Sequence, residues 1–219
     1  TLLPRSSYYI EQRQMQKYDD VVKKAIGVVS FFSFPATAGL IVIGKPLIAV
    51  FSGAQYLPAL PVLYCMAPII IAVSFASFLD NIILIPKRHE RFILYSQIFG
   101  SVLNIVLNYI FISLWGVLGA GLSTLIVEFS ITVIQLFCSL SHLKKFLAYM
   151  GKQILHSFIG TTAMCVSVCF LIRIIPSTVL QIAAGVIAGS AIYAAVEIAL
   201  RNDTAKLLLA SVHRRIHIR

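Results

Sequence analysis

The sequence contains few charged residues. Asp, Glu, Lys and Arg make up 12% of its 219 residues and hydrophobic residues make up 59%, whereas roughly a quarter of an ordinary soluble domain is charged. The chain also lacks stretches in which apolar and polar residues alternate, as the strands of a porin-type barrel require. These absences exclude both classes, and the predicted fold class is an all-α membrane protein.

Long apolar runs take the place of the missing charge. A membrane-spanning helix needs about 20 mostly apolar residues, and six runs meet this requirement: 25–44, 60–85, 92–113, 116–140, 154–175 and 179–200. The predicted organisation is therefore a six-span bundle over 25–200. It is preceded by the end of another span and a cytoplasmic amphipathic segment (1–24) and followed by a basic cytoplasmic tail (201–219). We expect 8–24 to form one helix on the membrane surface.

Basic residues are almost absent from every second connection. Of the 18 Lys and Arg residues, only Lys45 and Arg173 belong to the connections after the first, third and fifth runs. Short cytoplasmic loops retain Lys and Arg, so the other sixteen mark the inner face. This places both chain ends in the cytoplasm and the spans among membrane lipids. The net charge of +10 then requires no nucleic-acid partner.

The predicted outer loops are too short to carry a catalytic site. The four cysteines lie inside the apolar runs, and the five histidines lie at the inner edge without metal-ligand spacing. We therefore expect no enzymatic activity, no metal site and no cofactor. The chain begins at Thr1 without a signal-peptide pattern, and its opening residues resemble the end of a span. We therefore expect it to be a fragment of a larger protein.

Polar residues form stripes in three of the runs. Steps of three and four residues place them on one helical face, and they are the predicted cavity-lining residues: Asp80 and Asn81 in the second run, Gln97, Asn104 and Asn108 in the third, and Thr124 and Gln135 in the fourth. Three such helices would enclose a hydrated cavity. Hydrogen bonding between helices uses the same residue types and remains an alternative.

Glu128 is the predicted proton- or cation-coupling residue. It lies twelve residues into its run from Gly116, or about 18 Å at 1.5 Å per residue, in a hydrocarbon core about 30 Å thick. An ionisable group at that depth indicates a functional site. Glu197 and Arg173 lie near the ends of their runs, where we expect them to extend to the interface.

Small residues and one proline predict how the helices meet. Gly185 and Gly189 form a GxxxG pair, and Gly119 belongs to a group of small residues at the start of the fourth run. Both patterns favour close helix approach. Pro35 lies in the middle of the first run and is predicted to bend or break that helix.

Three segments together resemble the lipid-linked oligosaccharide and polysaccharide exporters. These are LLPRSS at 2–7, FPATAGL at 34–40 with the following KP and FSG, and the NxxxN of 104–108 with GVLGAG at 116–121 and Glu128. The resemblance covers roughly 1–140. The superfamily also contains multidrug/cation antiporters and the lipid II flippase. Asp80 departs from the pattern, which is usually uncharged at that position.

The resemblance implies a two-bundle transporter of twelve to fourteen spans, of which the six spans here would form the C-terminal bundle. It implies a flippase of the bacterial inner membrane that moves a polyprenyl-diphosphate-linked oligosaccharide by alternating access, for O-antigen or capsule assembly. A polysaccharide polymerase and a chain-length regulator would then be partners. A cation-coupled multidrug antiporter is the alternative within the superfamily. A membrane-embedded polymerase or acyltransferase is a third, which the short outer loops disfavour.

Overall fold

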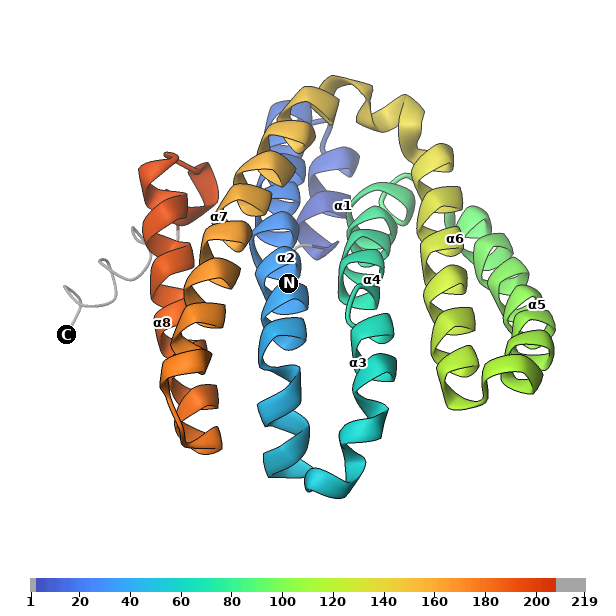
Figure 1. The fold of residues 1–219 in the computed structure, drawn as a ribbon. Coiled ribbons are helices and arrows are strands. Elements are labelled where there is room, and N and C mark those ends of the chain that lie inside the picture. Colours follow the sequence, from blue (N-terminus) through green and yellow to red (C-terminus); the bar gives the residue numbers. More distant parts are fainter. Residues whose placement is uncertain (1–2, 208–219) are drawn as a thin grey trace.

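The computed structural model describes residues 3–207, and this part of the chain is helical throughout, without strands (Figure 1). Its elements are α1 (Leu3–Glu11), α2 (Met15–Phe51), η1 (Ala54–Ala59), α3 (Leu60–Met66), α4 (Ile69–Phe78), the π-helix η2 (Leu79–Leu84), α5 (Glu90–Trp115), α6 (Val117–Leu143), η3 (Lys144–Phe146), α7 (Leu147–Ile174) and α8 (Thr178–Ala199). The end of the predicted basic tail, 208–219, lies outside the described residues.

The helices confirm the predicted class of all-α membrane protein. Five helical segments are long and apolar enough to cross a bilayer, and the fourth, Val117–Ile174, is 58 residues long. That segment contains α6 and α7, which run in opposite directions on either side of η3 (Figure 1). The six predicted runs therefore correspond to α2, the series α3–α4–η2, α5, α6, α7 and α8.

The predicted single surface helix over 8–24 is wrong. The chain turns at 12–14, where Arg13 has a φ of 55°, and Met15–Lys24 forms the first turns of α2. The apolar face of this segment, including Tyr18 and Val22, is buried against α4, η2 and α6. Periodicity revealed an amphipathic face, but it did not distinguish a face that covers protein from one that covers lipid.

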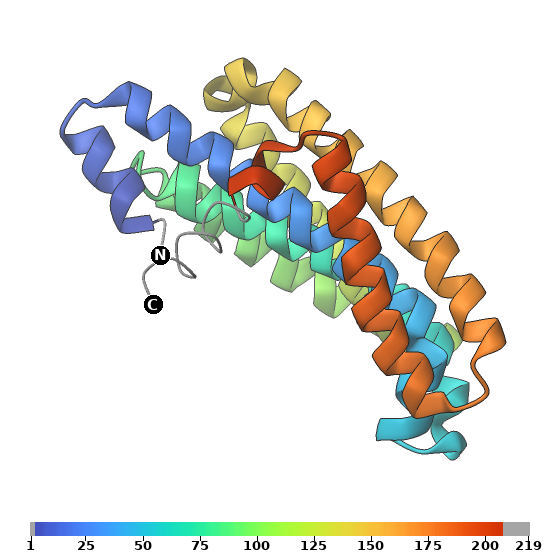
Figure 2. The ribbon, with the colours of Figure 1, turned by 90° about the vertical axis from the view of Figure 1, so that its left-hand side faces the viewer.

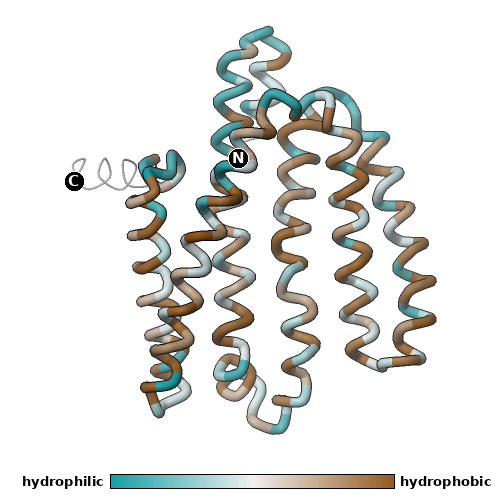
Figure 3. The backbone as a smooth tube through the Cα atoms, turned by 45° about the horizontal axis from the view of Figure 1, so that its top comes forward, coloured by the Kyte–Doolittle hydropathy of each residue, from teal (hydrophilic) through white to brown (hydrophobic). Residues whose placement is uncertain are grey.

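Charged groups gather at the end of the bundle where α2 begins, as the hydrophilic turns in Figure 3 show. Lys145 Nζ contacts Asp19 Oδ1 at 2.6 Å, and Lys87 Nζ lies 5.7 Å from the centre of the Tyr18 ring. Burial lowers the pKa of the Lys87 ammonium, the neighbouring Lys145 charge lowers it further, and Asp19 opposes both effects. The basic connections thus share one end, and its cytoplasmic orientation stays a prediction of the basic-residue rule.

A second core joins α2, α7 and α8, which lie side by side in Figures 1 and 2. Phe31, Met164, Val168 and Tyr193 are its main buried side chains. The GxxxG pair packs here as predicted: a Cβ at Gly185 would lie 3.0 Å from Ile43 and a Cβ at Gly189 would lie 3.0 Å from Val168. Small residues therefore set the spacing of these three helices.

The hairpin of α5 and α6 turns at Gly116, whose φ of 56° suits glycine. One turn later, a Cβ added at Gly119 would overlap the Phe111 carbonyl oxygen of α5. The close approach is between backbones, so rotation of a side chain cannot relieve it. Most of the lipid-facing surface of α5 is apolar; Tyr109, for example, is 84% exposed.

Substituting Gly119 by Ala should therefore destabilise the protein by about 1–3 kcal/mol, the usual cost of overpacking. Gly151→Ala is the matched control, because a Cβ at this position of α7 would meet nothing within 4 Å. The free energy of unfolding, measured by denaturation with SDS in mixed micelles, separates the two. Equal stability of both variants would contradict the close approach of α5 and α6.

Candidate functional site

The polar residues of α5 contact α6. Asn108 Nδ2 donates to Asn104 Oδ1 at 2.7 Å, and Ser123 Oγ of α6 donates to Asn108 Oδ1 at 2.5 Å. Ser123 is completely buried, whereas both asparagines are partly buried. The NxxxN pattern thus clamps α5 to α6, which is one of the two roles that the sequence allows. Gln97, on the same helix, is exposed.

A second polar cluster joins η2, α5 and α6. Gln135 of α6 is completely buried and its Nε2 donates to Ser96 Oγ of α5 at 3.1 Å. The same side chain lies beside the carboxyl of Asp80, whose Oδ1 is buried without a hydrogen-bond partner. The structure therefore brings Asp80 and Gln135 together from different helices. Ser96, which the stripe analysis missed, lies one position before Gln97 and completes this cluster.

The remaining predicted residues lie apart from these clusters. Asn81 faces α1 and α2, and its Nδ2 donates to the Ser77 carbonyl at 2.8 Å. Thr124 Oγ1 donates to the Ala120 carbonyl of its own helix at 3.0 Å. Glu128 is partly buried on α6, and its carboxylate forms no ion pair within the described part of the chain, where Lys145–Asp19 is the sole pair. The predicted cavity-lining set is thus distributed over several interfaces.

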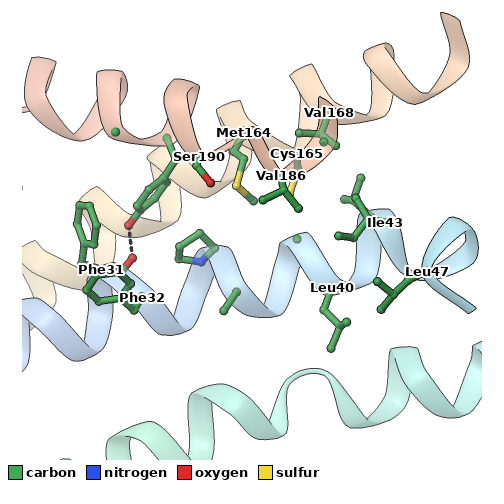
Figure 4. A pocket seen from close by; sticks show the side chains of 17 residues that line it. Phe31, Phe32, Leu40, Ile43, Leu47, Met164, Cys165, Val168, Val186 and Ser190 are labelled. Atoms are coloured by element: carbon green, nitrogen blue, oxygen red, sulfur yellow. Dashed lines mark hydrogen bonds between the residues drawn. The ribbon is translucent and has the colours of Figure 1, made fainter. Parts of the chain in front are cut away.

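Two grooves flank α2. The first, of about 460 Å³, lies between α2, α7 and α8 and is lined almost entirely by apolar side chains, including Leu40, Ile43 and Val186 (Figure 4). The second, of about 770 Å³, lies between α1, α2 and α4 and carries the polar side chains of Ser33, Ser74, Ser77 and Asn81. Phe32 of α2 lines both grooves. A long apolar chain and a polar group could therefore occupy neighbouring sites across one helix.

The first groove depends on an uninterrupted α2. Pro35 and Pro46 lie inside this helix, so of the predicted bend or break at Pro35 the break does not occur. Proline has no N–H to donate to the carbonyl four residues earlier, which here is that of Phe31. The Tyr193 hydroxyl of α8 donates to this carbonyl at 2.8 Å, the dashed bond in Figure 4. A neighbouring helix therefore replaces the bond that proline removes.

Tyr18 performs the same role at the opposite wall of the bundle. Pro86 deprives the Ile82 carbonyl of its donor, and the Tyr18 hydroxyl of α2 donates to Ile82 O at 3.0 Å. Both tyrosines are buried. Sequence reasoning did not assign this role to either tyrosine, although a proline within a span (Pro35) or directly after one (Pro86) was the available signal.

The surroundings of Glu197 also differ from those that the sequence predicted. The expectation that it extends to the interface is wrong, because its side chain is 0% exposed and faces the interior. Asn202 Nδ2 donates to its Oε2 at 2.5 Å. The segment after α8 folds back and covers this carboxylate, which hydropathy does not predict. Arg173, near the other end of the bundle, is exposed.

Comparison with family models matches residues 1–188 to the model described as "Lipid II flippase MurJ". The chain belongs to the lipid II flippase family. This match covers most of the 219 residues and confirms the superfamily and the non-enzymatic membrane flippase function that the motifs indicated. It names lipid II, and does not support the O-antigen or capsule type that the resemblance suggested. Comparisons with curated proteins and with solved structures gave no match.

Removing the Tyr193 hydroxyl should destabilise this lipid II flippase family member, because Pro35 leaves the Phe31 carbonyl without another donor. We expect Tyr193→Phe to lower the free energy of unfolding by about 1–3 kcal/mol, because the Phe31 carbonyl would lose its donor in a buried site. In a Pro35→Ala background the restored amide N–H replaces that donor, so the same substitution should cost less. Denaturation of the four proteins of this double-mutant cycle measures the coupling.

Tyr109→Phe on the exposed face of α5 is the control for loss of a tyrosine hydroxyl. Strictly additive effects of the Tyr193 and Pro35 substitutions would show that the hydroxyl does not compensate for the proline.

Proposed function

We propose that this chain takes part in flipping a polyprenyl-diphosphate-linked saccharide, with the lipid II class as substrate. The observation that carries the proposal is the pair of grooves on either side of α2, which share Phe32: the first is almost entirely apolar, and the second adds three serines and an asparagine to a largely apolar lining. The family match supports the same function independently. An O-antigen or capsule precursor has the same polyprenyl-diphosphate chemistry and is the second candidate.

The two grooves match the two parts of such a substrate. A polyprenyl tail is apolar, and the groove between α2, α7 and α8 contains hardly any polar surface. A sugar headgroup needs hydrogen-bonding partners because an unpaired polar group in hydrocarbon costs several kcal/mol. The serine side chains and Asn81 of the second groove supply such partners. The tail would stay in contact with lipid while the headgroup crosses beside α2 and α4.

Alternating access would require these surfaces to change their exposure. α5 packs mainly on α6, and α6 packs on α3 and α4, whereas α2 contacts α3, α4, α7 and α8. We infer that the helices around α2 form the substrate-contacting part, and that Asp80, Asn81 and Gln135 belong to its polar interior. A polymerase and a chain-length regulator remain expected partners only for the O-antigen alternative.

Filling the apolar groove tests the function. Val186 lines the groove, and its neighbour Ile187 on α8 lies outside it and is 73% exposed. Val186→Trp should slow flipping of fluorescent lipid II in proteoliposomes by at least about tenfold, since a blocked groove that costs 1.4 kcal/mol or more in substrate binding gives that factor. Ile187→Trp, with the same added volume, should leave the rate within about twofold.

Complementation identifies the substrate. Growth of cells depleted of their lipid II flippase should be restored by the complete two-bundle protein that contains this chain and by its Ile187→Trp variant, and not by its Val186→Trp variant; we expect this chain alone to insert without transporting. Restoration of O-antigen in a strain without its O-antigen flippase, in place of growth, would favour the second candidate. Equal activity of the two tryptophan variants on both substrates would refute the proposal that this groove binds the substrate.

We propose that Glu128 couples this transport to a proton or cation, because its partly buried carboxylate lies mid-way along α6 without an ion-pair partner in the described residues. Glu128→Gln keeps the hydrogen-bonding capacity and removes the titration. Flipping by this variant should lose its dependence on pH between about 6 and 8, while Glu90→Gln, at an exposed position, should retain it. A wild-type rate and pH profile for Glu128→Gln would leave Glu128 a purely structural role.

A further inference from the structure

The last membrane helix ends in a carboxylate that is wholly buried. Glu197 of α8 is 0% exposed, and its two oxygens have different surroundings. Oε2 accepts a hydrogen bond from Asn202 Nδ2 at 2.5 Å, whereas Oε1 is buried without a donor. A buried carboxylate normally satisfies both oxygens, because each unpaired one carries a desolvation cost.

Two side-chain oxygens of α7, the helix that packs on α8, are also buried. Gln153 Oε1 and Ser157 Oγ are buried without hydrogen-bond partners, and both side chains are at most 1% exposed. The Tyr193 hydroxyl lies within interaction distance of both the Ser157 and the Glu197 side chains, but it donates its own hydrogen to the Phe31 carbonyl. A Cβ added at Gly160 would lie 3.1 Å from Glu197 Oε1, so the backbone of α7 closes over this oxygen. Three buried oxygens, from Glu197, Gln153 and Ser157, therefore remain available to a further ligand.

The surrounding cations do not neutralise Glu197. In the described part of the chain the sole ion pair is Lys145–Asp19. The titratable and charged groups at this end of the elements that pack around Glu197 include Tyr193 on α8, Tyr149, Lys152 and His156 on α7, Lys23 and Lys24 on α2, and Arg201, Asp203 and Lys206 in the segment after α8. Of these, Lys23, Lys24, Lys152 and Arg201 are exposed, and Tyr149 interacts with Gln153 and Asp203.

We propose that Glu197, Gln153 and Ser157 form a binding site for one monovalent cation, taken up as a proton or as a sodium ion. Both supply the single positive charge that a buried carboxylate needs, and the free acceptor oxygens would face it. This site is separate from both grooves and from Glu128, and it does not depend on the substrate proposed above.

The site is placed to control the packing of α8 on α2. Asn202, which holds Glu197 Oε2, also accepts from the Thr204 amide at 2.9 Å, and Thr204 lies directly against Gly27 of α2. On the other side, Tyr193 donates to the Phe31 carbonyl at the edge of the apolar groove. Occupation of the site would therefore hold the segment after α8 and the groove wall in this arrangement, and loss of the cation would loosen both.

Thermal unfolding of the purified protein in detergent tests the site without any transport assay. Melting is followed from pH 5 to 9 in sodium chloride and, at equal ionic strength, in choline chloride. A sodium site predicts a Tm higher by about 2–4 °C in sodium at pH 8, the shift expected for a modest stabilisation of a chain of this size. A proton site predicts a Tm that falls as pH rises, equally in both salts, because a proton that binds only the folded protein stabilises it less as the proton concentration falls.

Glu197→Gln should abolish whichever response is found, and Glu11→Gln, at an exposed position, should retain it. Because Glu197→Gln could fail to fold, infrared spectroscopy of the unmodified protein gives a second readout. A protonated buried carboxyl shows a carbonyl stretch that disappears on titration, and a sodium-bound carboxylate shows sodium-dependent carboxylate bands. The same pH and sodium responses in the parent and in Glu197→Gln, or infrared bands that change with neither pH nor sodium, would overturn the proposal.

Discussion

The requirement that every backbone polar group in a hydrocarbon environment finds a partner inside the protein governs this structure. Helices meet most of it by themselves, and the exceptions show how the tertiary structure is held. Pro35 and Pro86 each leave a carbonyl without its donor, and Tyr193 and Tyr18 supply one from another helix. The prolines that local rules treat as helix breakers therefore become attachment points between helices.

Side-chain polarity follows the same constraint. Thr132 Oγ1 on α6 lies 2.8 Å from the Glu128 carbonyl of its own helix and 3.0 Å from the Ala72 carbonyl of α4, so one hydroxyl serves two helices. Asn108 joins Asn104 and Ser123 in a closed network. Because water does not compete in such sites, these bonds define which helix faces meet, whereas apolar contacts alone would let helices rotate against one another in lipid.

The sequence predicted the features that depend on composition along the chain. The length and hydropathy of the apolar runs gave the helices, and the GxxxG pair at Gly185 and Gly189 marked a true close approach. It did not predict features that depend on which face of a helix meets which neighbour. Tyr18 and Val22 read as a lipid-facing surface, and they are core residues because α4, η2 and α6 cover them. The grooves beside α2 likewise arise from three helices each, and no single run encodes them.

The two membrane carboxylates show why depth along a helix is an incomplete guide to burial. Glu128 lies mid-way along α6 and is only partly buried, whereas Glu197 lies at the end of α8 and is completely buried. The difference arises because α6 has part of its surface uncovered, while the chain after α8 turns at Arg201, whose φ is 55°, and brings Asn202 and Thr204 back over the helix end. Desolvation of a carboxylate depends on this local enclosure and not on distance from the membrane centre. For that reason the helix terminus, where an ionisable residue would ordinarily reach water, is where this fold buries a carboxyl group with no cationic partner among the described residues.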